Sequence, residues 1–145
     1  MTSQGTKNMY VYDESSFNQS AVIPYRITKG KVKILLVTNY KGSRWIIPKG
    51  IIEPDLTAAT SAAKEAEEEA GVTGTISKNS IGRYSYKKWG GVCKVQVFLL
   101  RVEKILDEWE EDYREREWVS VKEATQRVRE EKLKSLIWDV PDLIL

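Results

Sequence analysis

The alternation of apolar and polar residues predicts a β-sheet in the first third of the chain. Two apolar runs, "AVIPYRI" (21–27) and "VKILLVTNY" (32–40), flank "TKGK", which suits a hairpin. A shorter run, "RWIIP" (44–48), predicts a further strand. Because proline has no N–H to donate to a neighbouring strand, Pro24 predicts that the first strand lies at a sheet edge or carries a bulge.

A helical periodicity replaces this alternation from Thr57 to Ala70. Small apolar residues recur at helical spacing on one face: Ala59, Ala62, Ala63, Ala66 and Ala70. Asp55 or Thr57 is a suitable N-cap, and Gly71 predicts the end of the helix. Because the apolar side chains are small, we expect this helix to lie close to the sheet.

The second half of the chain predicts another hairpin and a closing helical segment. "SIGRYSYKKW" (80–89) and "VCKVQVFLLRVEK" (92–104) predict two strands joined at a Gly-Gly turn. An acidic loop (106–116) and a short strand (117–121) follow, and residues 122–140 predict one or two helices. The order of strands, helix, strands and helix predicts a mixed α/β or α+β domain.

Composition indicates one domain over residues 20–145, preceded by a polar, loosely ordered segment over residues 1–19. The net charge is only +2, so we expect no stable nucleic-acid complex. No apolar run approaches about 18 residues, so we expect no membrane span. Cys93 is the only cysteine, which excludes an internal disulfide and favours a reducing compartment. The cysteine does not separate a nuclear from a cytosolic location, and we expect a cytoplasmic one.

The chemistry-bearing feature is a run of glutamates late in the predicted helix. At about 100° per residue, Glu65, Glu68 and Glu69 share one face, whereas Glu67 points away. Such a run is ordinarily a solvated face. However, the helix macrodipole disfavours negative charge at this end, and the chain has no histidine. Carboxylates are therefore the available acid–base and metal-binding groups, and they suit hard cations such as Mg²⁺.

The stretch "GIIEPDLTAATSAAKEAEEEAGV" (50–72) resembles the Nudix box, G-x5-E-x7-R-E-U-x-E-E-x-G-U, in which U is a bulky apolar residue. The matching positions are Gly50, Glu65, Glu68, Glu69, Gly71 and Val72. Leu56 stands in place of the first Glu, Lys64 in place of Arg, and Ala66 in place of a bulky residue. Lys64 can neutralise a neighbouring carboxylate but lacks the bidentate fork of Arg. We expect Leu56 to weaken activity without abolishing it.

The resemblance extends to the diphosphoinositol polyphosphate phosphohydrolase branch of this family. It is carried by "RWIIPKG" and "ILDEWEEDYREREWVSVKEA", and it covers most of residues 20–135. The branch has basic residues entering its first strand, where this chain has Asn18, Gln19 and Ser20. A diadenosine or other nucleoside polyphosphate is therefore at least as suitable a substrate. The implied fold is α+β, an α/β/α sandwich with a mixed sheet packed between helices.

The resemblance implies a hydrolase that cleaves a phosphoanhydride bond with the help of Mg²⁺ or Mn²⁺. It assigns Glu65, Glu68 and Glu69 to the catalytic and metal-binding set, with the Gly50 carbonyl as a further metal ligand. Glu68 is the proton acceptor we expect, although family members differ in which Glu serves. Supporting roles are expected for Lys64 beside these acids and for two acids of the later loop, Glu111 and Asp112.

The expected partner is a small phosphorylated molecule. Its phosphates are expected to meet basic side chains at the mouth of the site: Lys49, Arg44, Arg83, Lys88 and Arg116. Tyr86 and Trp89 beside the Gly-Gly turn either stack on a base or pack within the hairpin. The alternative function is a non-catalytic, Nudix-like module that binds a nucleotide and regulates a partner, and a plain interaction domain is a third.

Overall fold

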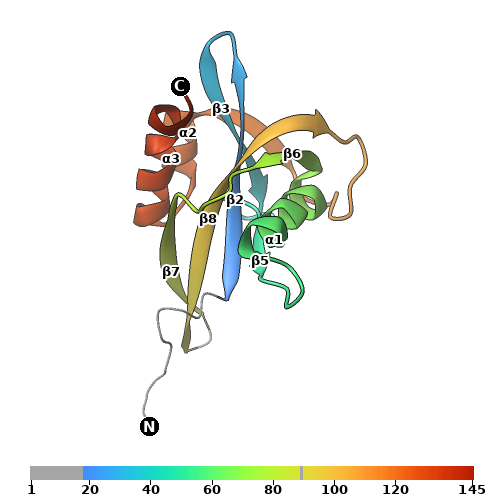
Figure 1. Ribbon diagram of the computed structural model, residues 1–145, viewed down its shortest axis with the longest axis vertical. Helices are drawn as coiled ribbons and strands as arrows, with labels where there is room; N and C mark the ends of the chain where they lie inside the picture. The colour runs from blue at the N-terminus through green and yellow to red at the C-terminus, as the bar shows by residue number, and fades with distance from the viewer. Residues whose placement is uncertain (1–17, 89) are drawn as a thin grey trace.

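The structure is a computed structural model and describes residues 18–88 and 90–145 (Figure 1). The loosely ordered segment predicted for residues 1–19 lies outside the described residues except for Asn18 and Gln19, and Gln19 begins a strand. Trp89 also lies outside them. None of the helices in the described ranges has the length and apolar content that crossing a bilayer requires.

The described strands form one mixed sheet with the order β4-β3-β2-β8-β6, to which β5, β7 and β9 add at β2, β8 and β3. β2 runs parallel to β8, and the other pairs are antiparallel. The bounds are β2 Gln19–Thr28, β3 Lys31–Thr38, β4 Trp45–Ile46, β5 Lys49–Ile51, β6 Val72–Ile76, β7 Gly82–Lys88, β8 Gly91–Ile105 and β9 Arg116–Ser120. The hairpins predicted between β2 and β3 and between β7 and β8 are confirmed.

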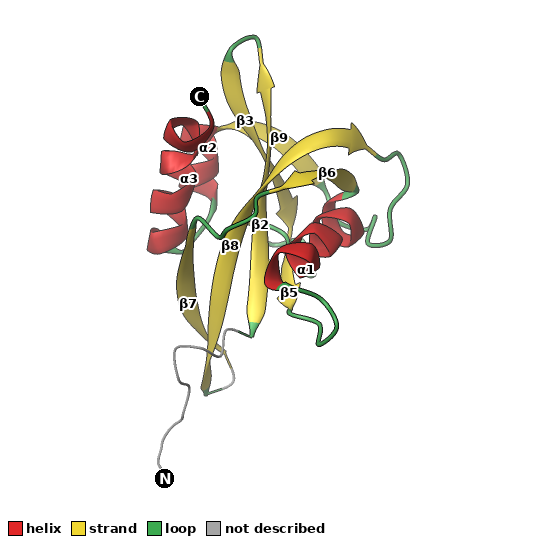
Figure 2. Cartoon of the chain, in the orientation of Figure 1, coloured by secondary structure: helices red, strands yellow, loops and turns green. Residues whose placement is uncertain are grey.

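Helices cover both faces of this sheet (Figures 1 and 2). On one face lies α1 (Ala58–Glu65), which continues as a π-helical turn, η1 (Ala66–Ala70). On the other face lie α2 (Val121–Arg127) and α3 (Glu131–Ile144). Each face has its own apolar core, one built on the helical alanines and one on α2 and α3. The predicted α+β sandwich is therefore confirmed.

The prediction that Pro24 places the first strand at an edge, or bulges it, was wrong. β2 is central, because β8 pairs with one side while β5 and β3 share the other. β5 pairs with Gln19–Ala21 and β3 with Tyr25–Thr28, so Pro24 falls between the two ladders. Val22 donates its N–H on this side to Pro48 O at 3.0 Å, and alternate residues point the same way. Position 24 therefore requires no N–H donor, because its N–H side faces the gap between the β5 ladder and the β3 ladder.

Two strands were not predicted from the sequence. Lys49–Ile51 was not predicted as a strand, yet it forms β5, because it pairs with the first residues of β2, Gln19–Ala21. Val72–Ile76 forms β6 although its polar composition, "VTGTI", gives little alternation. β5 brings Gly50 beside the helix, and β6 starts directly where the helix ends. Both strands therefore position the two ends of the glutamate-bearing segment.

Candidate active site

The helix that carries the glutamates is fixed at both ends by its sequence. The Thr57 side chain accepts a hydrogen bond from the N–H of Thr60, whose own side chain accepts one from the Thr57 N–H, which completes a capping box. Gly71 ends the helix in the left-handed conformation with φ 66°, as its position predicts. Between them, Ala62, Ala66 and Ala70 are fully buried against the sheet.

A π turn at Ala66–Ala70 was not predicted, and it changes how the glutamates are arranged. A π turn holds more residues than the 3.6 of an α turn. Glu65 and Glu69 therefore lie more nearly one above the other than a regular helix would place them. Their side chains are joined by a hydrogen bond, in which one carboxyl carries a proton. Glu69 is 7% exposed.

Gly50 lies directly against this carboxyl pair. A Cβ at Gly50 would stand 2.2 Å from Glu65 Oε2, so only glycine leaves room for the carboxyl group. The neighbouring backbone N–H of Lys49 donates to Glu69 Oε1 at 3.3 Å. Arg114 Nη2 lies 4.0 Å from the other oxygen of Glu69. The structure thus brings Glu65, Glu69 and Gly50 together.

Burial dominates the titration of these acids. It raises the pKa of Glu69 to about 8, against the opposing charge of Arg114 and with the help of Glu65 and Glu111. Burial also raises the pKa of Glu65, and Glu68 and Glu111 add to the shift. The pair therefore retains a proton near neutral pH. A cation placed between the two carboxyls would take the place of that proton.

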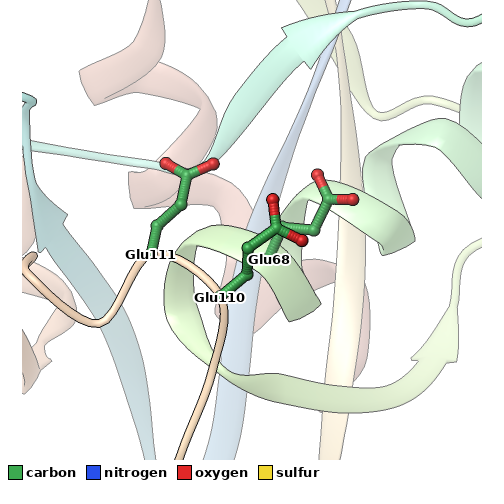
Figure 3. Close-up of side chains that lie close together, drawn as sticks. All are labelled: Glu68, Glu110 and Glu111. Atoms are coloured by element: carbon green, nitrogen blue, oxygen red, sulfur yellow. The ribbon is translucent and has the colours of Figure 1, made fainter.

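Glu68 lies beside Glu65 and Glu69 but faces the loop from Leu106 to Glu115. One oxygen from each of Glu68, Glu110 and Glu111 lies within 4.8 Å of the others. Figure 3 shows Glu68 projecting from the helical segment, and Glu110 and Glu111 from the neighbouring loop. Burial, then Glu110, raises the pKa of Glu68. The sequence did not single out Glu110, because only folding reveals which loop acid meets the helix.

Lys64 lies on the outer side of the same acids. Its Nζ is 2.8 Å from Glu53 Oε2 and 3.7 Å from Glu68 Oε2. Leu56, which stands where the resemblance expects a glutamate, donates its N–H to Glu53 O at 3.1 Å in a turn. The carboxylate nearest to Lys64 thus comes from Glu53, which lies three residues before Leu56. The sequence did not predict this pair, because Glu53 lies outside the helix, 11 positions before Lys64.

A cavity of about 900 Å³ opens beside Gly50 and Glu69. Its walls carry basic side chains from β5, β7, the β3–β4 loop and the segments before β9 and α3: Lys41, Arg44, Lys49, Lys87, Lys88, Arg114 and Arg129. Burial lowers the pKa of Lys49 more than Glu69 raises it, and Lys88 and Arg44 lower it further. Tyr86 lies under Lys49 Nζ at 5.3 Å from its ring centre. Tyr40, which is 78% exposed, also lines the cavity.

Three residues expected at the site lie elsewhere. Arg83 and Arg116 are not among the described residues that line the cavity, although Arg44, Lys49 and Lys88 are. Arg116 instead donates to the carbonyl groups of Ala70, Gly71 and Leu106, so its guanidinium belongs to the fold. Asp112 is exposed and is not part of the described acidic group, which Glu111 joins.

Most of the chain matches one known protein family. The family description "NUDIX domain" matches residues 17–138. The chain belongs to the Nudix family. It is 32% identical to Nudix hydrolase 13, mitochondrial, of Arabidopsis thaliana, over 87% of this chain and 74% of that protein. It is 31% identical to diphosphoinositol polyphosphate phosphohydrolase 3-beta of Bos taurus, over 78% of this chain and 70% of that protein.

Solved Nudix structures share the fold. The crystal structure of a C. elegans Ap4A hydrolase binary complex superposes with a TM-score of 0.76 and 22% identity. The match covers 89% of this chain and 98% of that chain. The family match and the curated relatives make the chain an enzyme of the Nudix hydrolase type.

The Nudix acids of this chain fit a divalent cation. The donors are carboxylate and carbonyl oxygens, the ligands that hard cations prefer. Burial raises the pKa of Glu65, Glu68 and Glu69, and neighbouring acids add to each shift. Arg114 opposes the shift at Glu69 and Lys64 opposes it at Glu68, but neither cancels it. Of the nearby cations, Arg114 donates two hydrogen bonds to Glu111 and stays 4.0 Å from Glu69. Additional positive charge among these carboxylates is therefore favourable.

The elevated pKa of Glu69 predicts a pH-dependent stability in the presence of a chelator. The folded state binds this proton more tightly than the unfolded chain, whose Glu pKa is about 4.3. The contribution is therefore complete below about pH 4 and is lost as the pH rises through about 8. We expect the free energy of unfolding to fall by roughly 3 kcal/mol between pH 5.5 and 8.5.

Denaturant titrations in EDTA at these two pH values measure the effect. Glu69→Gln should flatten the dependence, whereas the exposed Glu67→Gln should leave it unchanged. Equal slopes for wild type and Glu69→Gln would contradict the assignment of the proton to this pair.

Proposed function

We propose that this Nudix enzyme is a divalent-metal-dependent pyrophosphohydrolase, acting on a phosphoanhydride bond of a small substrate that carries several phosphates. The observation that carries the proposal is the juxtaposition of an acidic group, Glu65, Glu68 and Glu69, with a cavity lined by basic side chains. The acids suit cations, and the basic walls suit phosphates. A substrate that binds divalent cations through one pair of phosphates and carries further phosphates matches both the acidic group and the basic walls.

Each residue of the site has a distinct role in this proposal. Glu65, Glu69 and the Gly50 carbonyl would hold Mg²⁺ or Mn²⁺, with Glu68 and Glu111 on the adjoining side. When bound, such a cation neutralises the diphosphate and lowers the pKa of water. Glu68 is the proton acceptor, because it is more exposed than Glu69 and stands among acids that raise its pKa. Lys49 lies beside Glu69, lines the cavity and would bind the phosphate nearest to the acids.

The outer cavity determines which phosphorylated molecule is accepted. Arg44, Lys88 and Arg129 also line the cavity and would meet phosphates that are not cleaved. Tyr40 offers an exposed ring on which a nucleobase can stack. A dinucleoside polyphosphate uses both features, and a diphosphoinositol polyphosphate uses the cations alone. The retained Glu65, Glu68 and Glu69 argue against a non-catalytic regulatory module. A cytoplasmic location stays our prediction.

The test is hydrolysis of a defined panel. The intact protein is incubated with Mg²⁺ or Mn²⁺ and a dinucleoside tetraphosphate, a diphosphoinositol polyphosphate, a nucleoside triphosphate or ADP-ribose, and products are identified by mass. We expect cleavage of a phosphoanhydride bond that stops with EDTA. Tyr40→Ala should lower kcat/KM by about 10-fold for a dinucleoside substrate and leave an inositol substrate unchanged. No product from any substrate with either metal would overturn the proposal.

A further inference from the structure

The end of the π turn is bound by one distant segment of the chain. A helix leaves its last carbonyl groups without partners inside the helix. Here the segment 106–116 supplies the donors. The N–H of Glu111 donates to Glu68 O at 2.9 Å, and the N–H of Leu106 donates to Gly71 O at 2.8 Å. Between them, Trp109 Nε1 donates to Glu69 O at 3.1 Å.

Arg116 completes this set. Its Nη1 donates to Ala70 O at 2.9 Å and to Gly71 O at 3.3 Å, and its Nη2 donates to Leu106 O at 2.7 Å. The guanidinium also stacks on Trp109, 3.9 Å from the ring centre. The carbonyl groups from Glu68 to Gly71 are thus all bonded to the 106–116 segment. The positive charge of Arg116 stands where the macrodipole is negative.

Gly71 shows how closely these side chains fit. A Cβ at Gly71 would lie 2.6 Å from Arg116 Nη1 and 2.9 Å from the ring of Trp109. Two large side chains therefore occupy the space beside the helix end. A π turn is rarer than an α turn, and here its last carbonyl groups are bonded from outside the helix. The same segment carries Glu110 and Glu111, so these bonds also set the distance between the acids of the loop and those of the helix.

We propose that Trp109 and Arg116 are positioning residues of the carboxylate site: by binding the carbonyl groups of η1, they hold Glu68 and Glu69 where a cation is bound. The proposal rests on the metal-dependent function proposed above. Neither residue is among the described residues that line the basic cavity. Their loss should therefore change metal affinity and turnover, and it should change the binding of substrate phosphates much less.

Two conservative variants test the proposal. Trp109→Phe retains an aromatic ring under Arg116 but removes the N–H that donates to Glu69 O. Arg116→Lys retains the charge but cannot reach three carbonyl groups at once. The matched controls are Trp138→Phe, which changes a 61% exposed side chain on α3, and Arg26→Lys, whose guanidinium stacks on Trp118 in β9. Trp138→Phe removes an indole N–H from the opposite face of the sheet. Arg26→Lys removes a guanidinium from another Arg–Trp stack.

Binding of Mn²⁺ is measured by electron paramagnetic resonance, and kcat, KM and Tm are measured with the best substrate of the panel. Groups that orient metal ligands typically account for 10–100-fold in metal affinity or activity. We expect Trp109→Phe and Arg116→Lys to weaken Mn²⁺ binding and lower kcat by at least about 10-fold, with KM within about 3-fold. In the controls, Mn²⁺ affinity, kcat and KM should each stay within about 2-fold of wild type.

The outcomes separate this proposal from the proposed function. Wild type that binds Mn²⁺ and cleaves a substrate, together with variants equal to it, would overturn the positioning role alone. The positioning role is also overturned if the variants lose activity only in proportion to the fraction of unfolded chain. Wild type that neither binds Mn²⁺ nor cleaves any substrate would overturn both.

Discussion

Replacing Glu69 by Gln is expected to lower kcat/KM for the cleaved pyrophosphate by at least about 10²-fold at the metal concentration that saturates wild type. Glu69 is 7% exposed, accepts a hydrogen bond from the N–H of Lys49 and shares a proton with Glu65. Gln has nearly the same shape, so the fold should persist. It lacks the charge, however, and a neutral amide is a poor replacement for a carboxylate beside a cation.

Comparison with two other variants locates the effect. Glu67→Gln changes an exposed carboxylate of the same turn and should stay within about 2-fold of wild type. Glu68→Gln should also lose at least about 10²-fold, but mainly in kcat, because we assign proton transfer to it. Mn²⁺ titration followed by steady-state rates distinguishes the two losses. A Glu69→Gln enzyme with an unchanged rate and metal affinity would remove Glu69 from the site.

The helix and its acids were predictable because their signals are local. The spacing of the alanines sets the buried face, Thr57 caps the start, and Gly71 ends the helix in the left-handed conformation. All of these depend on residues within one helix. The π turn at Ala66–Ala70 was not predictable in the same way, because its carbonyl groups are bonded by residues about 40 positions later.

Long-range contacts also decided which charged residues reach the cavity. Arg114 and Arg116 are two residues apart and look alike in sequence, yet Arg114 lines the cavity and Arg116 binds the helix end. Arg116 begins β9 and Arg114 precedes it, so their directions depend on where the strand pairs with β3. Likewise Glu53 pairs with Lys64 through a turn whose geometry the sequence does not specify. The sequence therefore predicted which types of charged side chain are present, but only the tertiary structure shows which partner each one binds.

Gly50→Ala is expected to retain the fold while lowering kcat by about 10–100-fold. The new Cβ would stand 2.2 Å from Glu65 Oε2 and 2.4 Å from its carboxyl carbon. These atoms are the far end of a flexible side chain, so Glu65 can rotate away at little cost to stability. The rotation would separate Glu65 from Glu69 and break the arrangement that we assign to the cation. Circular dichroism, Tm, Mn²⁺ binding and steady-state rates measure the two consequences separately.

Gly82→Ala is the matched control, because its Cβ would stand 2.5 Å from Leu136 Cδ2, in the core on the opposite face of the sheet. Overfilling a core typically costs about 1–3 kcal/mol, so this variant should lose Tm and retain kcat. Gly50→Ala should do the reverse. Adding Glu65→Asp to Gly50→Ala shortens the displaced side chain by one methylene and should recover part of the Mn²⁺ affinity. If Gly50→Ala instead lowers Tm as Gly82→Ala does and leaves Mn²⁺ affinity unchanged, then the contact between Gly50 and Glu65 serves packing and not the cation.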